Sequence, residues 1–279
     1  MLPDPLEYPR MIRFENVGKT FPDGTCAVED FSLEVPAHTT TVLLGSSGCG
    51  KTTLLQMVNR MVDPTAGRVL VHGEDVASQD SVRLRRGIGY VMQNAGLLPH
   101  RTVLDNVLTV PRLTGRVSRA ARDHAHELLE LVGLPAALAK RYPAQLSGGQ
   151  RQRVGVARAL APDPDILLMD EPFSAVDPVV RADLQAEMLR IQRELAKTVL
   201  FVTHDVDEAV LLGDEVLVLR EGARIAQHGA GEDILLHPAD DFVRSFVGGD
   251  RRALHLEDRA GTATVVDGSG RVAGTLVQP

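Results

Sequence analysis

Gly45-Ser-Ser-Gly-Cys-Gly-Lys-Thr52 is the stretch of this 279-residue chain that decides the fold we expect. It fits the pattern G-x-x-x-x-G-K-[ST] in full, after a short buried strand expected at 39–44 and before a helical pattern at 51–61. The glycines let backbone amides turn toward phosphate groups, and the start of a helix adds the positive end of a dipole. The stretch therefore predicts a phosphate-binding loop in an α/β protein rather than a plain glycine-rich turn.

The loop also predicts roles for individual side chains. We expect Lys51 to reach the β- and γ-phosphates of a nucleotide and the Thr52 hydroxyl to ligate Mg²⁺. Cys49 is either a reactive thiol or a small residue of which only the backbone amide matters. The expected nucleotide-binding residues of this segment are Gly45, Ser46, Ser47, Gly48, Cys49, Gly50, Lys51, Thr52 and Thr53.

A second half of the site is expected at Ile166-Leu-Leu-Met-Asp-Glu171. Its four apolar residues predict a buried strand that delivers two carboxylates to the carboxyl edge of a parallel sheet, where ligands bind. We expect Asp170 to hold Mg²⁺ through water and Glu171 to polarise the attacking water. An apolar strand that ends in Asp-Glu is weak evidence alone, but it gains weight beside a complete phosphate loop.

Two polar residues follow other predicted strands. His204 ends the run 199–203 and is either a surface or capping residue or, as we prefer, a sensor of the γ-phosphate. Gln93 follows the strand expected at 88–92, and its amide is expected to reach the metal or the attacking water. The catalytic residues predicted from the pattern are therefore Glu171, His204 and Gln93, and the metal ligands are Thr52, Gln93 and Asp170.

Composition limits the function classes. A net charge of −7, an aromatic content of 4% and the absence of Trp disfavour a nucleic-acid binder. The two cysteines, Cys26 and Cys49, indicate a reducing compartment. Residues 1–14 lack the pattern of a signal peptide, and no run approaches the roughly 18 apolar residues of a membrane span. We expect a protein of the cytosol or of the cytosolic face of a membrane.

Strands alternate with helices along most of the chain, which predicts a mostly parallel sheet covered on both faces. Residues of about 94–158 are expected to form a helical insert, and 265–277 resemble one β-hairpin after a polar, glycine-rich start near 248. The other expected elements are an antiparallel β layer over 11–35, strands at 39–44, 67–72, 88–92, 166–169, 199–202, 215–219 and 224–228, and helices at 51–61, 118–132, 150–160, 180–195 and 206–212.

Leu146-Ser-Gly-Gly-Gln150 lies between the two halves of the site, just before the helix expected at 150–160. A helix start without a phosphate loop of its own is still a place for an anion. Together with the phosphate loop, Gln93, Asp170-Glu171, Ser174-Ala-Val-Asp177 and His204, this segment makes residues 11–245 resemble the ATP-binding subunits of ABC transporters.

The resemblance implies an α/β fold with a P-loop NTPase (RecA-like) core, an N-terminal antiparallel β layer and an inserted helical subdomain. It implies that residues 1–247 form the nucleotide-binding domain and that 248–279 are a short extension, similar to part of a CBS unit. It also implies a homodimer around two ATP and two Mg²⁺ ions, in which Ser147, Gly148, Gly149 and Gln150 cap the γ-phosphate of the partner's ATP. Asp177 would couple the two sites, and Phe21 would either stack on adenine, the reading we favour, or lie in the hairpin core.

A narrower resemblance concerns the substrate. Residues 84–93, 96–100 and 168–173 look like those of importers of quaternary-amine osmoprotectants such as glycine betaine, choline or carnitine. The partners implied are permease subunits, contacted by 94–111, and indirectly a substrate-binding protein, at the cytoplasmic face of the membrane. The alternatives are an ABC ATPase of another transporter class and a soluble one that acts on nucleic acid or ribosomes.

Overall fold

The computed structural model describes residues 10–115, 117–174, 176–249, 254–259, 262–267 and 271–275. Its centre is a six-stranded sheet in the order β10-β9-β3-β8-β7-β6, in which only β10 runs antiparallel to its neighbour. This confirms the mostly parallel sheet. The strands are β3 (Thr40–Gly45), β6 (Ile88–Val91), β7 (Ile166–Asp170), β8 (Thr198–Thr203), β9 (Glu215–Leu219) and β10 (Ile225–Gly229).

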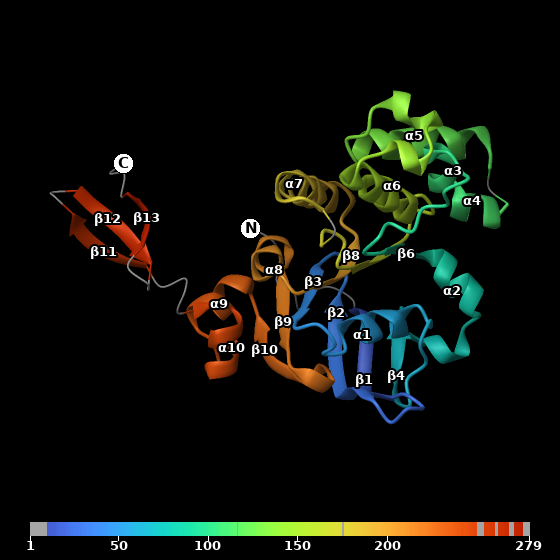
Figure 1. Cartoon of the computed structure of the whole chain (residues 1–279). Coiled ribbons are helices and arrows are strands. Elements are labelled where there is room, and N and C mark those ends of the chain that lie inside the picture. The colour runs from blue at the N-terminus through green and yellow to red at the C-terminus, as the bar shows by residue number, and fades with distance from the viewer. Residues whose placement is uncertain are drawn as a thin grey trace.

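Alternate residues of these strands enter two different cores, as the two faces of a pleated sheet require. Leu43, Leu168 and Leu200 pack in the core shared with the antiparallel sheet and α1 (Lys51–Val58). Val42, Leu167 and Phe201 pack in the core shared with helices on the opposite face. The central sheet is thus covered on both sides, which Figure 1 shows as helices and the second sheet flanking β3 and β8.

The antiparallel layer predicted over 11–35 is confirmed. Its sheet has the order β2-β1-β4-β5, with strands β1 (Arg10–Thr20), β2 (Cys26–Pro36), β4 (Ala66–Val71) and β5 (Glu74–Asp75). Phe31, Leu33 and Val35 face its core as the alternation predicts, and the Phe14 and Phe31 rings meet edge to face. This sheet lies on the face of the central sheet that also carries α1.

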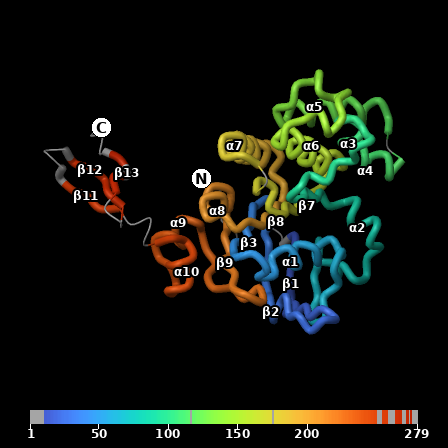
Figure 2. The backbone as a smooth tube through the Cα atoms, viewed as in Figure 1, coloured from blue at the N-terminus to red at the C-terminus, as the bar shows by residue number. Residues whose placement is uncertain are grey.

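The chain between β6 and β7 forms a group of helices that stands to one side of the central sheet in Figures 1 and 2. These helices are α3 (Val103–Val107), α4 (Thr109–Leu113), α5 (Arg119–Leu131) and α6 (Gly148–Leu160). Ser118 caps α5, and Ala125, Leu128 and Leu129 are its buried residues, as the periodicity predicts. The remaining helices are α2 (Ser81–Gly87), α7 (Pro178–Leu195), α8 (Val206–Leu212), α9 (Gly231–Leu236) and α10 (Asp241–Phe246).

Three predicted helix boundaries are wrong by two or three residues. The helix expected at 180–195 begins at Pro178, because Asp177 is already its N-cap. The helix expected at 51–61 ends at Val58, because Arg60 takes a positive φ of 56° and the Asn59 side chain binds the Met61 amide. The helix expected at 150–160 begins at Gly148, because Ser147 is already its N-cap. All three differences concern how the helix ends are capped and not the type of element.

At the C-terminal end, β11 (Leu254–Arg259), β12 (Thr262–Asp267) and β13 (Val272–Thr275) form a separate antiparallel sheet. The pairing of β12 with β13 agrees with the predicted hairpin, although its turn lies outside the described residues. Residues 1–9, most of the segment without a signal-peptide pattern, also lie outside them. β11 was not predicted. None of the helices in the described part of the chain has the length and apolar character needed to cross a bilayer.

Candidate nucleotide site

The loop 45–50 bends from the end of β3 into the start of α1 through two glycines with positive φ, Gly48 at 81° and Gly50 at 110°. A Cβ atom on Gly50 would lie 2.3 Å from the carbonyl oxygen of Ala27, so no larger residue fits there. The loop is also tied to the segment that follows β9, since the Ala223 amide donates to the Cys49 carbonyl over 2.7 Å. The backbone is therefore held in the form that a phosphate cradle needs.

Lys51 lies inside this loop. Its side chain is only 4% exposed, and its ammonium donates to the carbonyl oxygens of Gly45 and Ser46 over 2.7 Å each. The Cys49 thiol is buried and accepts from the same ammonium over 3.8 Å, and whether it is reactive or matters only through its backbone amide stays a prediction. A hollow of about 210 Å³ opens here, lined by Ala27, Ser47, Gly48, Gly50, Lys51, Thr52, Thr53 and Glu171.

Two of the three predicted metal ligands, Thr52 in the first turn of α1 and Asp170 at the end of β7, meet. The Thr52 hydroxyl donates to Asp170 Oδ1 over 2.9 Å, and the Tyr90 hydroxyl donates to Asp170 Oδ2 over 3.3 Å. Burial raises the pKa of Asp170, and the nearby Glu171 charge adds to this, while the two hydrogen bonds oppose it. A hydroxyl beside one carboxylate, completed by phosphate oxygens and water, is an oxygen donor set that fits Mg²⁺.

Glu171 and His204 also come together, although they follow different strands. His204 Nδ1 lies 3.0 Å from Glu171 Oε2, and the Glu171 amide donates to the Val202 carbonyl over 3.0 Å. Glu171 has a positive φ of 43°, an unusual conformation for a residue with a side chain. The carboxylate is thereby aimed from the end of β7 at the hollow above the phosphate loop, within reach of His204.

Gln93 is placed differently from Thr52. Its amide donates to Ser174 Oγ over 3.0 Å, and Ser174 Oγ in turn donates to the Glu171 carbonyl over 2.9 Å. Ser174 was part of a quoted motif without being assigned a role, and Tyr90 was not predicted. Each of these two residues contacts the site through a hydrogen bond to a residue far along the chain, which a local sequence pattern does not reveal. The roles of Gln93 as metal ligand and water-positioning residue stay predictions.

The segment 146–150 opens α6. Ser147 Oγ accepts from the Gln150 amide over 3.2 Å, and Gln150 Oε1 accepts from the Ser147 amide over 3.0 Å, which is a reciprocal capping box. Ser147 and Gly148 are exposed, whereas Gly149 is buried. None of these residues belongs to the described residues that line the hollow at the phosphate loop. The segment is an exposed helix start outside this chain's own phosphate cradle.

Gly149 joins this segment to the start of α7. A Cβ atom on Gly149 would lie 2.3 Å from Val180 Cγ1, so the two helix starts are in close contact. Asp177 is exposed and caps α7 by accepting from the Val180 amide over 3.1 Å. Ala175, within the quoted motif 174–177, lies outside the described residues. The contact places Asp177 and the capping segment on neighbouring turns of two helices.

Phe21 sits at the hairpin between β1 and β2. Its ring is half-buried and lies under the Lys19 ammonium, 5.3 Å from nitrogen to ring centre. Its amide and carbonyl close the turn with Thr25 and Gly24. The ring is not part of the buried core, so the alternative of a hairpin core residue loses support, and stacking on adenine stays a prediction.

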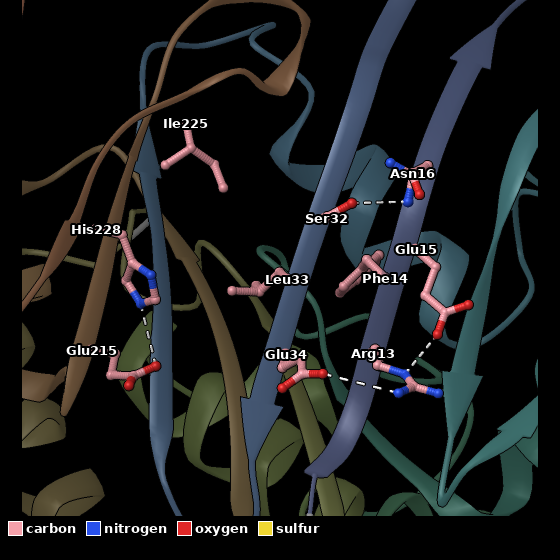
Figure 3. A pocket seen from close by; sticks show the side chains of 10 residues that line it. All are labelled: Arg13, Phe14, Glu15, Asn16, Ser32, Leu33, Glu34, Glu215, Ile225 and His228. Atoms are coloured by element: carbon pink, nitrogen blue, oxygen red, sulfur yellow. Dashed lines mark hydrogen bonds and ion pairs between the residues drawn. The ribbon is translucent and has the colours of Figure 1, made fainter. Parts of the chain in front are cut away.

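A second hollow, of about 630 Å³, lies between the edge strands β2 and β10, as Figure 3 shows. Its charged side chains pair with one another: Arg13 with Glu15 at 2.9 Å and His228 with Glu215 at 3.3 Å. Nothing in it resembles the phosphate cradle. The predicted residues Lys51, Thr52, Asp170, Glu171 and His204 lie at or just after the carboxyl ends of β3, β7 and β8.

Comparisons with known proteins agree with this geometry. A family model described as "ABC transporter" matches residues 28–174. The carnitine transport ATP-binding protein OpuCA of Listeria monocytogenes is 45% identical over 241 residues, which cover 86% of this chain and 60% of that protein. The glycine betaine uptake system ATP-binding protein YehX of Escherichia coli is 45% identical over 264 residues, 95% of this chain and 85% of that protein.

Among solved structures, the dimer of the ATP-binding cassette MJ0796 in a post-hydrolysis state, bound to ADP and Pi, is similar with a TM-score of 0.72 and 33% identity. The structural match covers 79% of this chain and 98% of the MJ0796 chain. The chain spans only about three fifths of the length of the first curated relatives, 60% for the carnitine protein and 63% for a choline transport protein of Bacillus subtilis. The matched family model, the shared fold and the assembled site show that this chain belongs to the ABC transporter family.

Proposed function

We propose that this chain is the ATP-hydrolysing subunit of an importer and that two copies close around two ATP molecules and their Mg²⁺ ions. The observation that carries the proposal is the separation of the two anion sites within one chain. The phosphate loop, Asp170 and Glu171 gather at one hollow, while Ser147 and Gly148 are exposed elsewhere at the start of α6. Each copy would offer that helix start to the ATP held by the other copy.

The residues have distinct roles in this proposal. The loop amides and Lys51 bind and orient the phosphates, and Thr52 and Asp170 would hold the Mg²⁺, which neutralises charge on the phosphate oxygens. Glu171 orients the attacking water, and His204, which contacts it, lies where the γ-phosphate would be sensed. Gln93 reports occupancy through Ser174 and the segment that follows it.

The transported class is a quaternary amine of the glycine betaine, choline or carnitine type. The names of relatives that are 45% identical to this chain, a carnitine transport protein and a glycine betaine uptake protein, support this proposal. Residues 1–247 would form the nucleotide-binding domain, and 94–111 would receive a cytoplasmic helix of the permease. Met92, Leu98 and Leu113 are exposed apolar side chains in and next to this segment, which suits such a contact. The chain would thus act at the cytoplasmic face of the membrane.

The enzymatic part is tested with Glu171→Gln. The variant keeps the shape of the side chain and removes its charge, so nucleotide binding should persist while hydrolysis falls by about a hundredfold or more. Binding is measured with a fluorescent ATP analogue and hydrolysis by phosphate release. Hydrolysis at the wild-type rate would contradict the role of Glu171.

The transport part is tested by purifying the chain from its own cells and identifying what accompanies it. We expect integral membrane subunits, and after reconstitution in liposomes together with the substrate-binding protein, ATP-driven uptake of radiolabelled glycine betaine. Uptake of a different solute class would assign the chain to another transporter. Membrane proteins that fail to co-purify, with hydrolysis stimulated by nucleic acid, would favour a soluble ATPase.

A further inference from the structure

A buried polar cluster lies between α7 and α8 beside the site. Glu208 is its centre, with only 3% of its surface exposed. Thr203 Oγ1 donates to Glu208 Oε2 over 2.7 Å, and Gln185 Nε2 donates to Glu208 Oε1 over 3.2 Å. Burial raises the pKa of Glu208, and the charge of Asp205 also raises it, which is the cost of keeping a carboxyl group in this position.

Arg181 connects this cluster to the loop that carries Asp177. Its Nη1 lies 3.4 Å from Asp205 Oδ2, and its Nη2 donates to the Val176 carbonyl over 3.3 Å. The guanidinium therefore bridges Val176, which precedes Asp177, and Asp205, the N-cap of α8. Among the described residues, its buried Nε–H donor has no acceptor.

The same cluster holds both neighbours of His204. Thr203 Oγ1, which donates to Glu208, also accepts from the Asp205 amide over 3.0 Å. Asp205 Oδ1 accepts from the Asp207 and Glu208 amides over 2.9 Å and 3.1 Å. The His204 side chain itself is 53% exposed, so packing around the ring does not fix it. Its place 3.0 Å from Glu171 depends on how its two neighbours are held.

We propose that Arg181 and Glu208 are positioning residues that hold the 176–177 turn and the strand end carrying His204 as one unit. A contact made by a second copy at the exposed Asp177 is then passed through Arg181 and Asp205 to His204, and so to Glu171. This inference rests on the proposed hydrolysis of ATP by a closed pair, and it adds a physical link between the pair interface and the catalytic carboxylate.

The test compares truncated and conservative variants in the purified chain. Arg181→Met and Glu208→Ala should lower kcat for ATP by between about tenfold and a hundredfold, the size of effect expected when a reacting group is misplaced. The KM for ATP should change little, because the phosphate loop is untouched. Glu208→Gln keeps the size and can accept from Thr203, so it should stay near the wild-type kcat.

Folding is followed by thermal unfolding of every variant. If Arg181→Met does not fold, Arg181→Lys replaces it, because lysine keeps the charge but cannot bridge Asp205 and Val176 with two planar donors, and its kcat should still fall. Asp177→Ala combined with Arg181→Met should lower kcat no further than the stronger single change, since both interrupt one connection.

The outcomes separate this inference from the proposed function. If Glu171→Gln abolishes hydrolysis but folded Arg181→Met hydrolyses ATP at the wild-type rate, the inference is overturned and the proposed function stands. An equal loss of kcat in Glu208→Gln and Glu208→Ala, or full additivity with Asp177→Ala, would overturn it as well. Hydrolysis that Glu171→Gln does not reduce would overturn the proposed function and the inference with it.

Discussion

The phosphate loop 45–52 and the segment 146–150 both contain glycines and both start a helix. They differ in whether side chains cap the amides at that helix start. Gly50, the N-cap of α1, has no side chain to cap the helix, so the amides of the first turn are left for a ligand. Ser147 and Gln150 cap α6 with their own side chains and use two amides in doing so. The start of α1 thus leaves its first amides open for the phosphates that we propose it binds, whereas the start of α6 already satisfies the Ser147 and Gln150 amides with its own side chains.

The surroundings reinforce the difference. The loop has a buried lysine and, at its edge, Asp170 bound to Thr52. The segment has neither, and its buried glycine packs on Val180 of α7. Under the proposed function, a complete nucleotide site combines the first region of one copy with the second region of another. Changes in the two regions should therefore differ in what they do to nucleotide binding and to hydrolysis.

The largest effect is expected from Lys51→Ala, which removes the ammonium inside the loop. Both nucleotide binding and hydrolysis should be lost, with hydrolysis falling by about a hundredfold or more. Lys140→Ala is the matched control, since Lys140 is exposed in the helical group. Binding is measured by calorimetry and hydrolysis by phosphate release. Unchanged binding in Lys51→Ala would show that the loop is not the anion site.

Gly149→Ala should separate binding from hydrolysis. The added methyl group would lie 2.3 Å from Val180 Cγ1, so the start of α6 must shift away from α7. We expect single copies to bind ATP as before, while hydrolysis falls by between about tenfold and a hundredfold because the second copy no longer fits. Gly87→Ala is the control, because a Cβ atom there meets open space. A parallel loss of binding would remove the distinction between the two regions.

The smallest effect is expected from Phe21→Ala, which removes the ring that we expect to contact the adenine base of ATP. If the half-buried ring stacks on adenine, ATP affinity should fall by about fivefold, and Phe21→Tyr should restore it. Inorganic tripolyphosphate, which has no base, should bind both proteins equally. A fall in tripolyphosphate affinity in Phe21→Ala would indicate that the ring supports the hairpin instead.

Much of the first region could be predicted from the sequence, because each of its parts is a local pattern. The loop glycines, the apolar runs of β3 and β7 and the acidic pair that ends β7 are contiguous in the chain. Parallel pairing then brings the strand ends to one edge of the sheet, which joins Thr52 to Asp170 and His204 to Glu171. Local pattern and sheet geometry were enough for these contacts.

What the sequence could not supply depends on partners far along the chain. The short helices α2, α3, α4, α9 and α10, of five to seven residues each, were not predicted one by one, although the seven-residue α8 was. Helices this short are held by packing rather than by propensity. Tyr90, Arg181 and Glu208 likewise look ordinary in sequence, and their roles appear only when β6, α7 and α8 are brought beside Asp170 and His204.

The division of one nucleotide site between two copies is tested most directly by mixing two inactive variants. Lys51→Ala damages only the first region, and Ser147→Arg damages only the second. Each alone should hydrolyse ATP poorly, since every pair it forms has two defective sites. A mixture should recover hydrolysis, because a mixed pair joins the intact loop of one copy to the intact helix start of the other. A mixture no more active than the sum of its parts would contradict the account.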